Sequence, residues 1–254
     1  MNNKYDEVIE LVKSAEKFVF STELCKDVSM KGDADFVTLV DISISNYLKN
    51  ELKKIYPDAG FFSEEESGKL TDVCWILDPI DGTTNLVYGY NMSSISLALY
   101  KNGKIVFGVV YNPFTKECFH SIIGEGAYLN KEKISVSSRE LKDSLIEFGA
   151  GSTRKSEAEK TFKIAKEVFC NCVDLRRICS SALDICYIAA GRIDGYFESR
   201  LKPWDYAAAS LILQEAGGSI STYDNCEVSM AQPSSVIASN GIVGEDLRNI
   251  INKY

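Results

Sequence analysis

An apolar run gives way to polar side chains at Cys74-Trp75-Ile76-Leu77-Asp78-Pro79-Ile80-Asp81-Gly82-Thr83-Thr84-Asn85. Residues 73–77 have the length and the aromatic and β-branched content of a strand that is buried on both faces. Because proline cannot donate to a central ladder, Pro79 predicts that this strand ends at Asp78. Gly82-Thr83-Thr84 then predicts the start of a helix, whose first backbone N–H groups are free to bind an anion.

Two carboxylates, Asp78 and Asp81, lie three residues apart on this turn. Hard cations such as Mg²⁺ bind through one or two carboxylates together with substrate phosphate, so the turn suggests a metal next to a phosphate. An Asx-Pro turn with a capping Asp and a Thr at the helix N-cap explains the same residues without any ligand. The turn alone leaves both interpretations open.

Length and composition are those of an ordinary globular protein, because 254 residues with 45% hydrophobic content can form one large domain or two closely associated domains and bury a core. No apolar run approaches the roughly 20 residues that span a bilayer, which predicts no membrane partner. The acidic N-terminus, with Asp6, Glu7 and Glu10, lacks the charge order of a signal peptide, so we expect a cytoplasmic protein. A net charge of -8 argues against a nucleic-acid partner.

Cysteine and histidine usage narrows the chemistry. The eight cysteines contain no C-x-x-C pair, which favours scattered free thiols in a reducing compartment. The single histidine, His120, lies in a strand-like pattern. One histidine cannot form a multi-histidine zinc site, and its position argues against a Ser-His-Asp triad. Any chemistry must rest on carboxylates, hydroxyls and bound cations.

The apolar periodicity predicts two arrangements of helices and strands. Helices are expected at about 3–20 and 41–56, then an antiparallel meander with strands at 94–100, 104–111, 118–123 and 133–136. Strands at 145–148, 173–178, 194–198, 219–222 and 235–239 then alternate with helices at 156–169, 181–190, 206–216 and 244–252. We predict a layered α/β fold with two halves, residues 1–140 and 141–254, that form one functional unit.

Other acids follow predicted strands or open predicted helices. Glu64, Glu65 and Glu66 come after the short strand 61–63, so the first two can project from the same sheet end as Asp78. Glu66 is equally explained by a solvated acidic loop. Asp41 lies near the start of a helix, where an acid also stabilises the helix dipole. Asp205 opens a helix after Pro203-Trp204.

The ordered set of these motifs resembles the inositol monophosphatase family, the Mg²⁺-dependent, lithium-sensitive phosphomonoesterases. The resemblance covers nearly the whole chain and is closest to the bacterial inositol-1-monophosphatase type. Its motifs are Asp35-Phe36-Val37-Thr38-Leu39-Val40-Asp41, Phe61-Phe62-Ser63-Glu64-Glu65, the run from Trp75 to Asn85, Trp204-Asp205-Tyr206-Ala207-Ala208 and Glu215-Ala216-Gly217-Gly218. The resemblance implies an αβαβα sandwich with a mainly antiparallel N-terminal sheet and a smaller, mixed C-terminal sheet.

The resemblance also implies two to three Mg²⁺ ions per site and a role for each matching residue. One ion is expected on Glu64, Asp78 and the Ile80 carbonyl, a second on Asp78, Asp81 and Asp205, and a weaker third near Glu64 and Glu65. Thr83, held by Asp41, and Glu64 are expected to orient the attacking water. Substrate contacts are expected from Asp81, Gly82, Thr83, Ser181, Ala182, Glu198 and Asp205, with Lys31 as a further candidate cation.

Two assignments stay open at this point. Counting from Tyr56-Pro57 favours Glu64 as the ligand, but a slip of one residue also matches, because Ser67 follows Glu66. Glu198 suits a polyol hydroxyl, and a surface acid at a strand end explains it as well.

The resulting hypothesis is a phosphatase that hydrolyses a small phosphate monoester, with myo-inositol 1-phosphate as the favoured substrate, by in-line attack of activated water. Relatives with the same metal motifs act on fructose 1,6-bisphosphate or 3'-phosphoadenosine 5'-phosphate, so these substrates remain alternatives. A non-catalytic regulator that binds RNA-processing or transcription partners is a further alternative. Homodimerisation is implied by the resemblance and has no signature of its own in the sequence.

Overall fold

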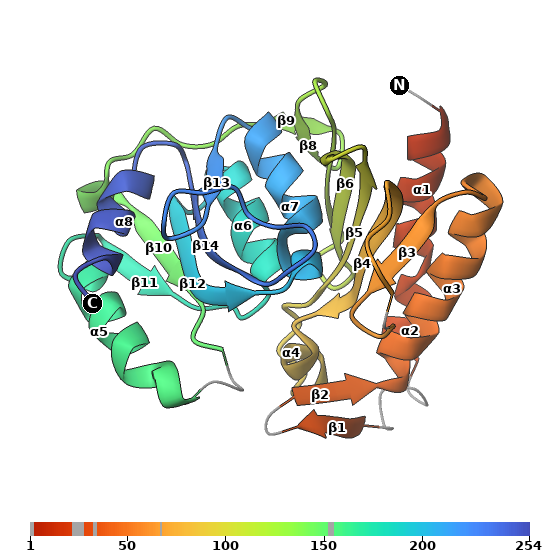
Figure 1. Ribbon diagram of the computed structural model, residues 1–254, viewed down its shortest axis with the longest axis horizontal. Coiled ribbons are helices and arrows are strands. Elements are labelled where there is room, and N and C mark those ends of the chain that lie inside the picture. The colour runs from red at the N-terminus through yellow and green to blue at the C-terminus, as the bar shows by residue number, and fades with distance from the viewer. Residues whose placement is uncertain (1–2, 22–27, 33–34, 67, 152–154) are drawn as a thin grey trace.

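The computed structural model describes residues 3–21, 28–32, 35–66, 68–151 and 155–254, and only the backbone at 3, 28–32 and 35–37. Helices and sheets alternate through the molecule in the order helix, sheet, helix, sheet, helix (Figure 1). Within the described residues, no helix is both long and apolar enough to cross a membrane.

A seven-stranded sheet forms the core of the first half. Its strands lie in the order β3 (Gly60–Ser63), β4 (Val73–Asp81), β5 (Ser94–Lys101), β6 (Lys104–Asn112), β7 (Glu117–Ile122), β8 (Ala127–Leu129) and β9 (Glu132–Ile134). All neighbours are antiparallel except β3 and β4. Its outer face is covered by α1 (Asn3–Ser14), α2 (Glu16–Val19) and α3 (Leu39–Ile55).

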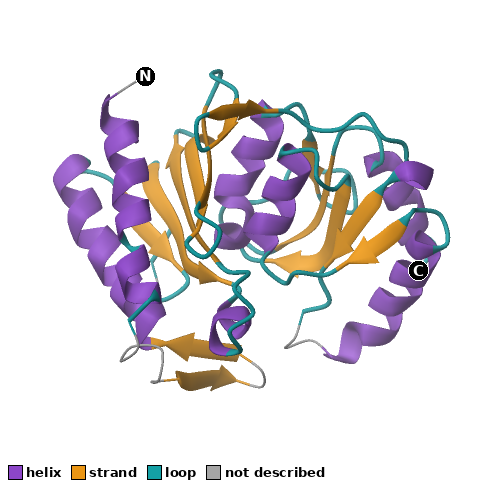
Figure 2. Ribbon diagram, turned by 180° about the vertical axis from the view of Figure 1, so that it is seen from behind, coloured by secondary structure: helices purple, strands orange, loops and turns teal. Residues whose placement is uncertain are grey.

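Two helices, α6 (Ser181–Ala189) and α7 (Pro203–Glu215), lie between the two sheets, as both views show (Figures 1 and 2). Both are apolar around most of their circumference, as expected for helices that pack on two sides. Their side chains share one core cluster with Ile76 of β4 and Tyr196 of the second sheet. Because this core joins both halves, they are packed into one body, and the division at residue 140 stays a prediction.

The second sheet has five strands in the order β11 (Asp174–Arg176), β10 (Leu145–Phe148), β12 (Gly195–Leu201), β14 (Ser234–Ser239) and β13 (Ser219–Ser221). It mixes parallel and antiparallel pairs. On its far side lie α5 (Ala158–Phe169) and α8 (Gly244–Ile251), which pack on a separate core. Short elements complete the chain: β1 (Val28–Gly32), β2 (Asp35–Thr38), α4 (Thr83–Val87), η2 (Leu141–Asp143) and η3 (Lys155–Glu157).

The predicted layered fold, with a mainly antiparallel first sheet and a smaller mixed second one, is confirmed. The predicted free thiols are also found, since the seven described cysteines form no disulfide. His120 lies in β7 with its Nε2 2.9 Å from the Asn130 carbonyl oxygen, as a strand residue with a local hydrogen bond. Two short strands, β8 and β9, replace the single strand predicted at 133–136.

The prediction that β4 ends at Asp78 is wrong, because the strand continues through Pro79 to Asp81. Asp78 pairs with Ser96 and Asp81 with Ser94, so the β4 segment holds one residue more than its partner. This bulge removes the need for a proline N–H in the ladder. It also turns the end of β4, where both carboxylates lie.

Candidate active site

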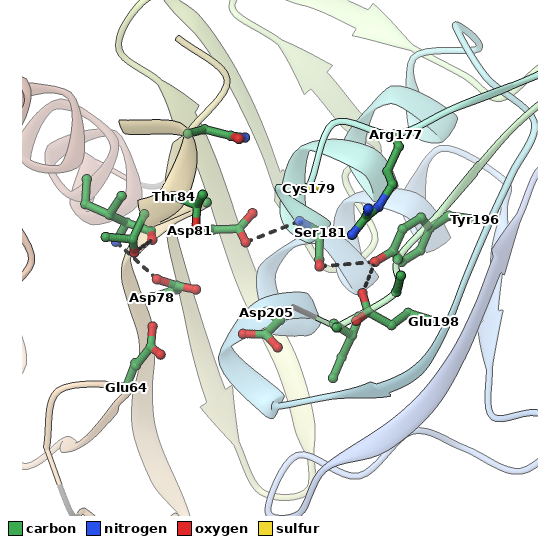
Figure 3. Close-up of a pocket in the computed structure, with 18 residues that line it drawn as sticks. Glu64, Asp78, Asp81, Thr84, Arg177, Cys179, Ser181, Tyr196, Glu198 and Asp205 are labelled. Carbon is green, nitrogen blue, oxygen red and sulfur yellow. Dashed lines mark hydrogen bonds between the residues drawn. The ribbon is translucent and has the colours of Figure 1, made fainter. Parts of the chain in front are cut away.

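One pocket of about 370 Å³ is lined by acidic side chains from the residue after β3 and from β4, β12 and α7 (Figure 3). Nine of the residues predicted for the site line it: Glu64, Asp78, Ile80, Asp81, Gly82, Thr83, Ser181, Glu198 and Asp205. Figure 3 shows Glu64, Asp78, Asp81 and Asp205 directed into this space. The chain therefore brings together acids that are up to 141 residues apart in sequence (205 − 64 = 141).

The parallel pairing of β3 with β4 explains why the first acids meet. Ser63 pairs with Leu77, so Glu64 and Asp78 follow the same end of two neighbouring strands. The Glu64 N–H also donates to the Leu77 carbonyl at 3.3 Å. This confirms the expectation that both acids project from one sheet edge.

Of the three consecutive acids, Glu64 lines the pocket, and its Oε1 lies 3.6 Å from Lys202 Nζ. Glu66 instead accepts a hydrogen bond from Lys49 Nζ at 2.5 Å. Glu65 is outside the described lining, but its charge acts on Asp41. The geometry thus favours the frame in which Glu64 is the pocket acid.

Asp81 joins the end of β4 to the start of α6. Its Oδ2 accepts from Ser180 Oγ at 2.5 Å and from the Ala182 N–H at 2.8 Å, and its Oδ1 accepts from the Ser181 N–H at 3.2 Å. A carboxylate at a helix N-terminus is stabilised by these free N–H groups and by the helix dipole. Ala182, predicted to contact substrate, therefore acts on Asp81 and does not belong to the described lining.

Gly82 begins α4 in a left-handed conformation, with φ of 88°. A side chain there would be strained, so glycine allows the chain to turn from β4 into the helix. The turn leaves Gly82 and Thr83 on the pocket wall. The predicted helix start at this position is confirmed.

Thr83 is tied to Asp41, as predicted. Thr83 Oγ1 lies 3.2 Å from Asp41 Oδ1 and 3.0 Å from the Ile80 carbonyl, and its single proton serves one of them at a time. Asp41 also accepts from the Thr38 N–H and hydroxyl, at 2.8 and 2.6 Å, in a capping box at the start of α3. Burial raises the pKa of Asp41 to about 6. The side chain of Lys31, the further candidate cation, lies outside the described part of the chain.

Asp205 lies in the first turn of α7, which begins at Pro203 and not at the predicted residue 206. Proline is favoured at the first helical position because its missing N–H is not needed there. Asp205 Oδ2 accepts from the Lys202 N–H at 2.7 Å and so caps the helix. The Asp205 carboxylate thus both caps the start of α7 and lines the pocket.

The acids raise one another's pKa. Burial and the charges of Glu64, Asp81 and Asp205 hold the pKa of Asp78 well above its usual range. Burial raises the pKa of Asp81 to about 6, and burial with the Asp81 charge raises that of Asp205. A hard cation would relieve this repulsion, and carboxylate and carbonyl oxygens are the donors that Mg²⁺ prefers. The chemistry of the donors therefore fits Mg²⁺, although the described residues include no group of three or more His, Cys, Asp or Glu side chains already placed to hold an ion.

The opposite side of the pocket carries hydroxyls and one further acid, Glu198. Ser181 Oγ lies 3.2 Å from the Tyr196 hydroxyl, which donates to Glu198 Oε2 at 2.6 Å. Glu198 is only 7% exposed and packs on Gly149, where an added Cβ would lie 1.8 Å from Oε2. Glycine at 149 is therefore needed to seat this carboxylate, which is not the surface acid of the alternative interpretation.

Several lining residues were not predicted: Thr84, Asn85, Gly149, Ala150, Gly151, Arg177, Cys179, Tyr196 and Leu201. Tyr196 lies two residues before Glu198 on β12, so the alternation of a strand places both on one face. That spacing was a usable signal once Glu198 was chosen. Arg177 follows β11, whose pairing with β10 no local pattern reveals.

Glu147 of β10 and Asp184 of α6 form a buried carboxyl pair outside the described lining. Each is 2% exposed, and a hydrogen bond joins them. Burial and the charge of Glu147 hold the pKa of Asp184 well above its usual range, and burial also raises the pKa of Glu147. Two ionised carboxylates cannot donate to each other, so the folded pair retains a proton that the unfolded chain releases.

We expect Asp184→Asn to gain stability relative to the parent as pH rises. A raised folded-state pKa contributes stability that is complete below the unfolded value of about 3.9 and is lost as pH rises through the folded value. The asparagine amide donates to Glu147 at every pH. Urea unfolding without metal at about pH 5 and about pH 8 checks this, and an unchanged difference in unfolding free energy would contradict the shared proton.

Comparison with known proteins places the chain in one family. The model of the inositol monophosphatase family matches residues 2–253. Nus factor SuhB of Vibrio cholerae is 39% identical over 216 residues, which cover 84% of this chain and 80% of that protein. Inositol-1-monophosphatase of Mesorhizobium japonicum is 36% identical over 230 residues, which cover 89% and 86%.

Solved structures share the whole architecture. The extragenic suppressor protein suhB from Bartonella henselae matches with a TM-score of 0.91 and 32% identity, covering 99% of this chain and 98% of that one. An IMPase/NADP phosphatase complexed with Mg²⁺ and phosphate matches with a TM-score of 0.89 and 26% identity, covering 99% and 96%.

Proposed function

This chain belongs to the inositol monophosphatase family, and we propose that it is a Mg²⁺-dependent phosphatase of small phosphate monoesters. The observation that carries this proposal is the meeting of Glu64, Asp78, Asp81 and Asp205 in one pocket beside the start of α4. The related IMPase/NADP phosphatase, which was solved with Mg²⁺ and phosphate, supports it.

The family resemblance implies how the oxygen donors would be shared between the ions. We propose that Glu64, Asp78 and the Ile80 carbonyl hold one ion and that Asp78, Asp81 and Asp205 hold a second. A third would lie near Glu64 and Glu65. Bound Mg²⁺ would supply positive charge that neutralises the phosphate dianion and activates water.

The chain's own groups then position the reactants. The Gly82 and Thr83 N–H groups, at the turn into α4, would bind phosphate oxygens. Thr83 Oγ1, held by Asp41 and the Ile80 carbonyl, would orient the attacking water together with Glu64. Because Glu64, Asp78 and Thr84 of α4 lie on one side of the pocket, water would attack in line with a leaving group on the side of Tyr196 and Glu198.

The leaving-group side suits a polyol. Glu198 and the Tyr196 and Ser181 hydroxyls form a chain of acceptors and donors that can bind sugar hydroxyls. This favours myo-inositol 1-phosphate as substrate, with Asp81 and Asp205 also facing the ester. Fructose 1,6-bisphosphate and 3'-phosphoadenosine 5'-phosphate remain the alternatives, because the metal motifs do not distinguish them.

The test is release of inorganic phosphate from these three substrates, with Mg²⁺ and with EDTA. We expect Mg²⁺-dependent release, highest in kcat/KM for myo-inositol 1-phosphate, and inhibition by Li⁺ at fixed Mg²⁺. Release that persists in EDTA would contradict the metal requirement. No release from any substrate would contradict the catalytic function.

A regulatory role is the second candidate, because several relatives are named Nus factor SuhB. Because relatives carry this name, the prediction that the chain has no nucleic-acid partner is not supported. They do not remove the case for catalysis, since the acids of the pocket are all present. A cytoplasmic location and a homodimer remain proposals that rest on the family resemblance.

A further inference from the structure

A lysine outside the pocket lining reaches one of the proposed metal ligands. Lys202 Nζ lies 3.6 Å from Glu64 Oε1, although Lys202 is not one of the lining residues. The Glu64 side chain is 18% exposed and that of Lys202 is 50% exposed, so the lysine is the partner with more freedom to move. The proposed function gives this ion pair no role.

The main chain of Lys202 is held in place independently of its side chain. Its N–H donates to Asp205 Oδ2 at 2.7 Å, at the start of α7. A substitution of the lysine side chain leaves this hydrogen bond intact, because the backbone makes it. The charge of Lys202 can therefore be removed without removing the cap of α7.

A second position for the ammonium lies close to Glu64. Lys202 Nζ is 5.2 Å from the centre of the Trp204 ring, and the face of an indole attracts a cation. Trp204 packs edge to face on Phe62, with 5.2 Å between the ring centres, and Phe62 lies two residues before Glu64. A rotation of the lysine side chain is thus enough to exchange the carboxylate for the ring.

The ion proposed on Glu64 needs the carboxylate that Lys202 contacts. Mg²⁺ bonds carboxylate oxygens at about 2.1 Å, so an ion on Glu64 Oε1 and the ammonium in its present place would lie within about 6 Å of each other. Two positive centres at this separation are closer than the Debye length of physiological salt, and they repel each other. Binding of the ion therefore favours departure of the lysine.

We propose that Lys202 competes with this Mg²⁺ for Glu64. The inference rests on the proposed function, because it concerns the first ion of that site. The ammonium pairs with Glu64 when the ion is absent and moves to the Trp204 ring when the ion binds. Lys202 thereby lowers the affinity of the Glu64 ion and sets the Mg²⁺ concentration at which the site fills, with a smaller effect on the second proposed ion.

Calorimetric titration of the metal-stripped protein with Mn²⁺ measures these affinities without turnover. The parent is compared with Lys202→Met, which removes the charge, and with Lys202→Arg, which keeps it. Lys49→Met is the matched control, because Lys49 pairs with Glu66, which lies two residues after Glu64 and outside the described lining. Glu64→Gln shows which binding event belongs to the Glu64 ion.

We expect Lys202→Met to lower the Kd of the Glu64 event about fivefold, the upper end of what an exposed ion pair contributes, and that of the other event by less than about twofold. The Mg²⁺ concentration for half-maximal phosphate release should fall with it. Lys202→Arg should stay within about twofold of the parent, because the charge remains. Lys49→Met should leave both events within about twofold as well.

A crystal of the parent soaked with Mn²⁺ tests the movement of the lysine without any variant. We expect Lys202 Nζ to leave Glu64 for the face of the Trp204 ring when the ion is bound. A lysine that kept its 3.6 Å contact beside the bound ion would overturn the competition.

An unchanged or raised Kd of the Glu64 event in Lys202→Met would overturn this inference and leave the phosphatase function intact. Equal tightening of both events would also overturn it, because that result indicates a general electrostatic effect and not competition for one ligand. The same tightening in Lys202→Arg would overturn it by showing that the charge is not the cause. No Mn²⁺ binding by the parent would overturn the proposed metal site and this inference together.

Discussion

Asp78→Asn is expected to lower kcat/KM for a phosphate monoester by at least about a thousandfold at saturating Mg²⁺, because the affected carboxylate belongs to both proposed ion sites. The amide keeps the size of the side chain and can still accept from the Ile80 N–H, which lies 3.1 Å from Asp78 Oδ1. The loss should therefore come from charge and not from misfolding.

The same variant should be at least as stable as the parent when metal is absent. Asp78 is 2% exposed and is surrounded by the charges of Glu64, Asp81 and Asp205, so its neutralisation removes repulsion. Thermal unfolding in EDTA measures this. Glu66→Gln is the matched control, because Glu66 pairs with Lys49, and it should keep the activity within about twofold. Full activity of Asp78→Asn would exclude the proposed site.

Asp205→Asn and Asp205→Ala are expected to lower kcat/KM alike, by about a hundredfold or more, since each removes an anionic ligand of the second proposed ion. They should differ in stability. Asp205 is the third residue of α7 and accepts from the Lys202 N–H in a capping box, and loss of such a hydrogen bond costs about 1 kcal/mol, whereas the amide oxygen of asparagine can still accept it.

Activity assays and thermal unfolding of the two variants separate these roles. The expected result is equal inactivity with a lower Tm for the alanine variant alone. If asparagine restored most of the activity, Asp205 would act through the helix cap and not through its charge.

The sequence predicted the layers of this fold because each element carries its own periodicity. Two-sided apolar strands such as residues 73–77 and the small-residue helix after Asp205 are recognisable without knowing their partners. The end of β4 was mispredicted because Pro79 is compatible with a strand once a bulge removes its ladder hydrogen bond. A bulge depends on the partner strand, which local sequence does not reveal.

The site was predictable to the extent that its acids follow the ends of strands or open helices. Glu64 and Asp78 meet because β3 and β4 are parallel neighbours, an arrangement that the sequence allowed but did not prove. The contacts of Asp81 with α6, about 100 residues later, arise only from tertiary packing. Arg177 was missed for the same reason, whereas Tyr196 could have been found from its two-residue spacing to Glu198 on β12.

The claim on which the account depends is that Glu64, Asp78, Asp81 and Asp205 bind divalent cations together. An anomalous difference map from a crystal soaked with Mn²⁺ and phosphate tests it directly. We predict at least two peaks in the pocket, one bonded to Glu64 and Asp78 and the other to Asp78, Asp81 and Asp205, with phosphate beside Gly82 and Thr83. A map without peaks there, with the four carboxylates turned to separate partners, would contradict it.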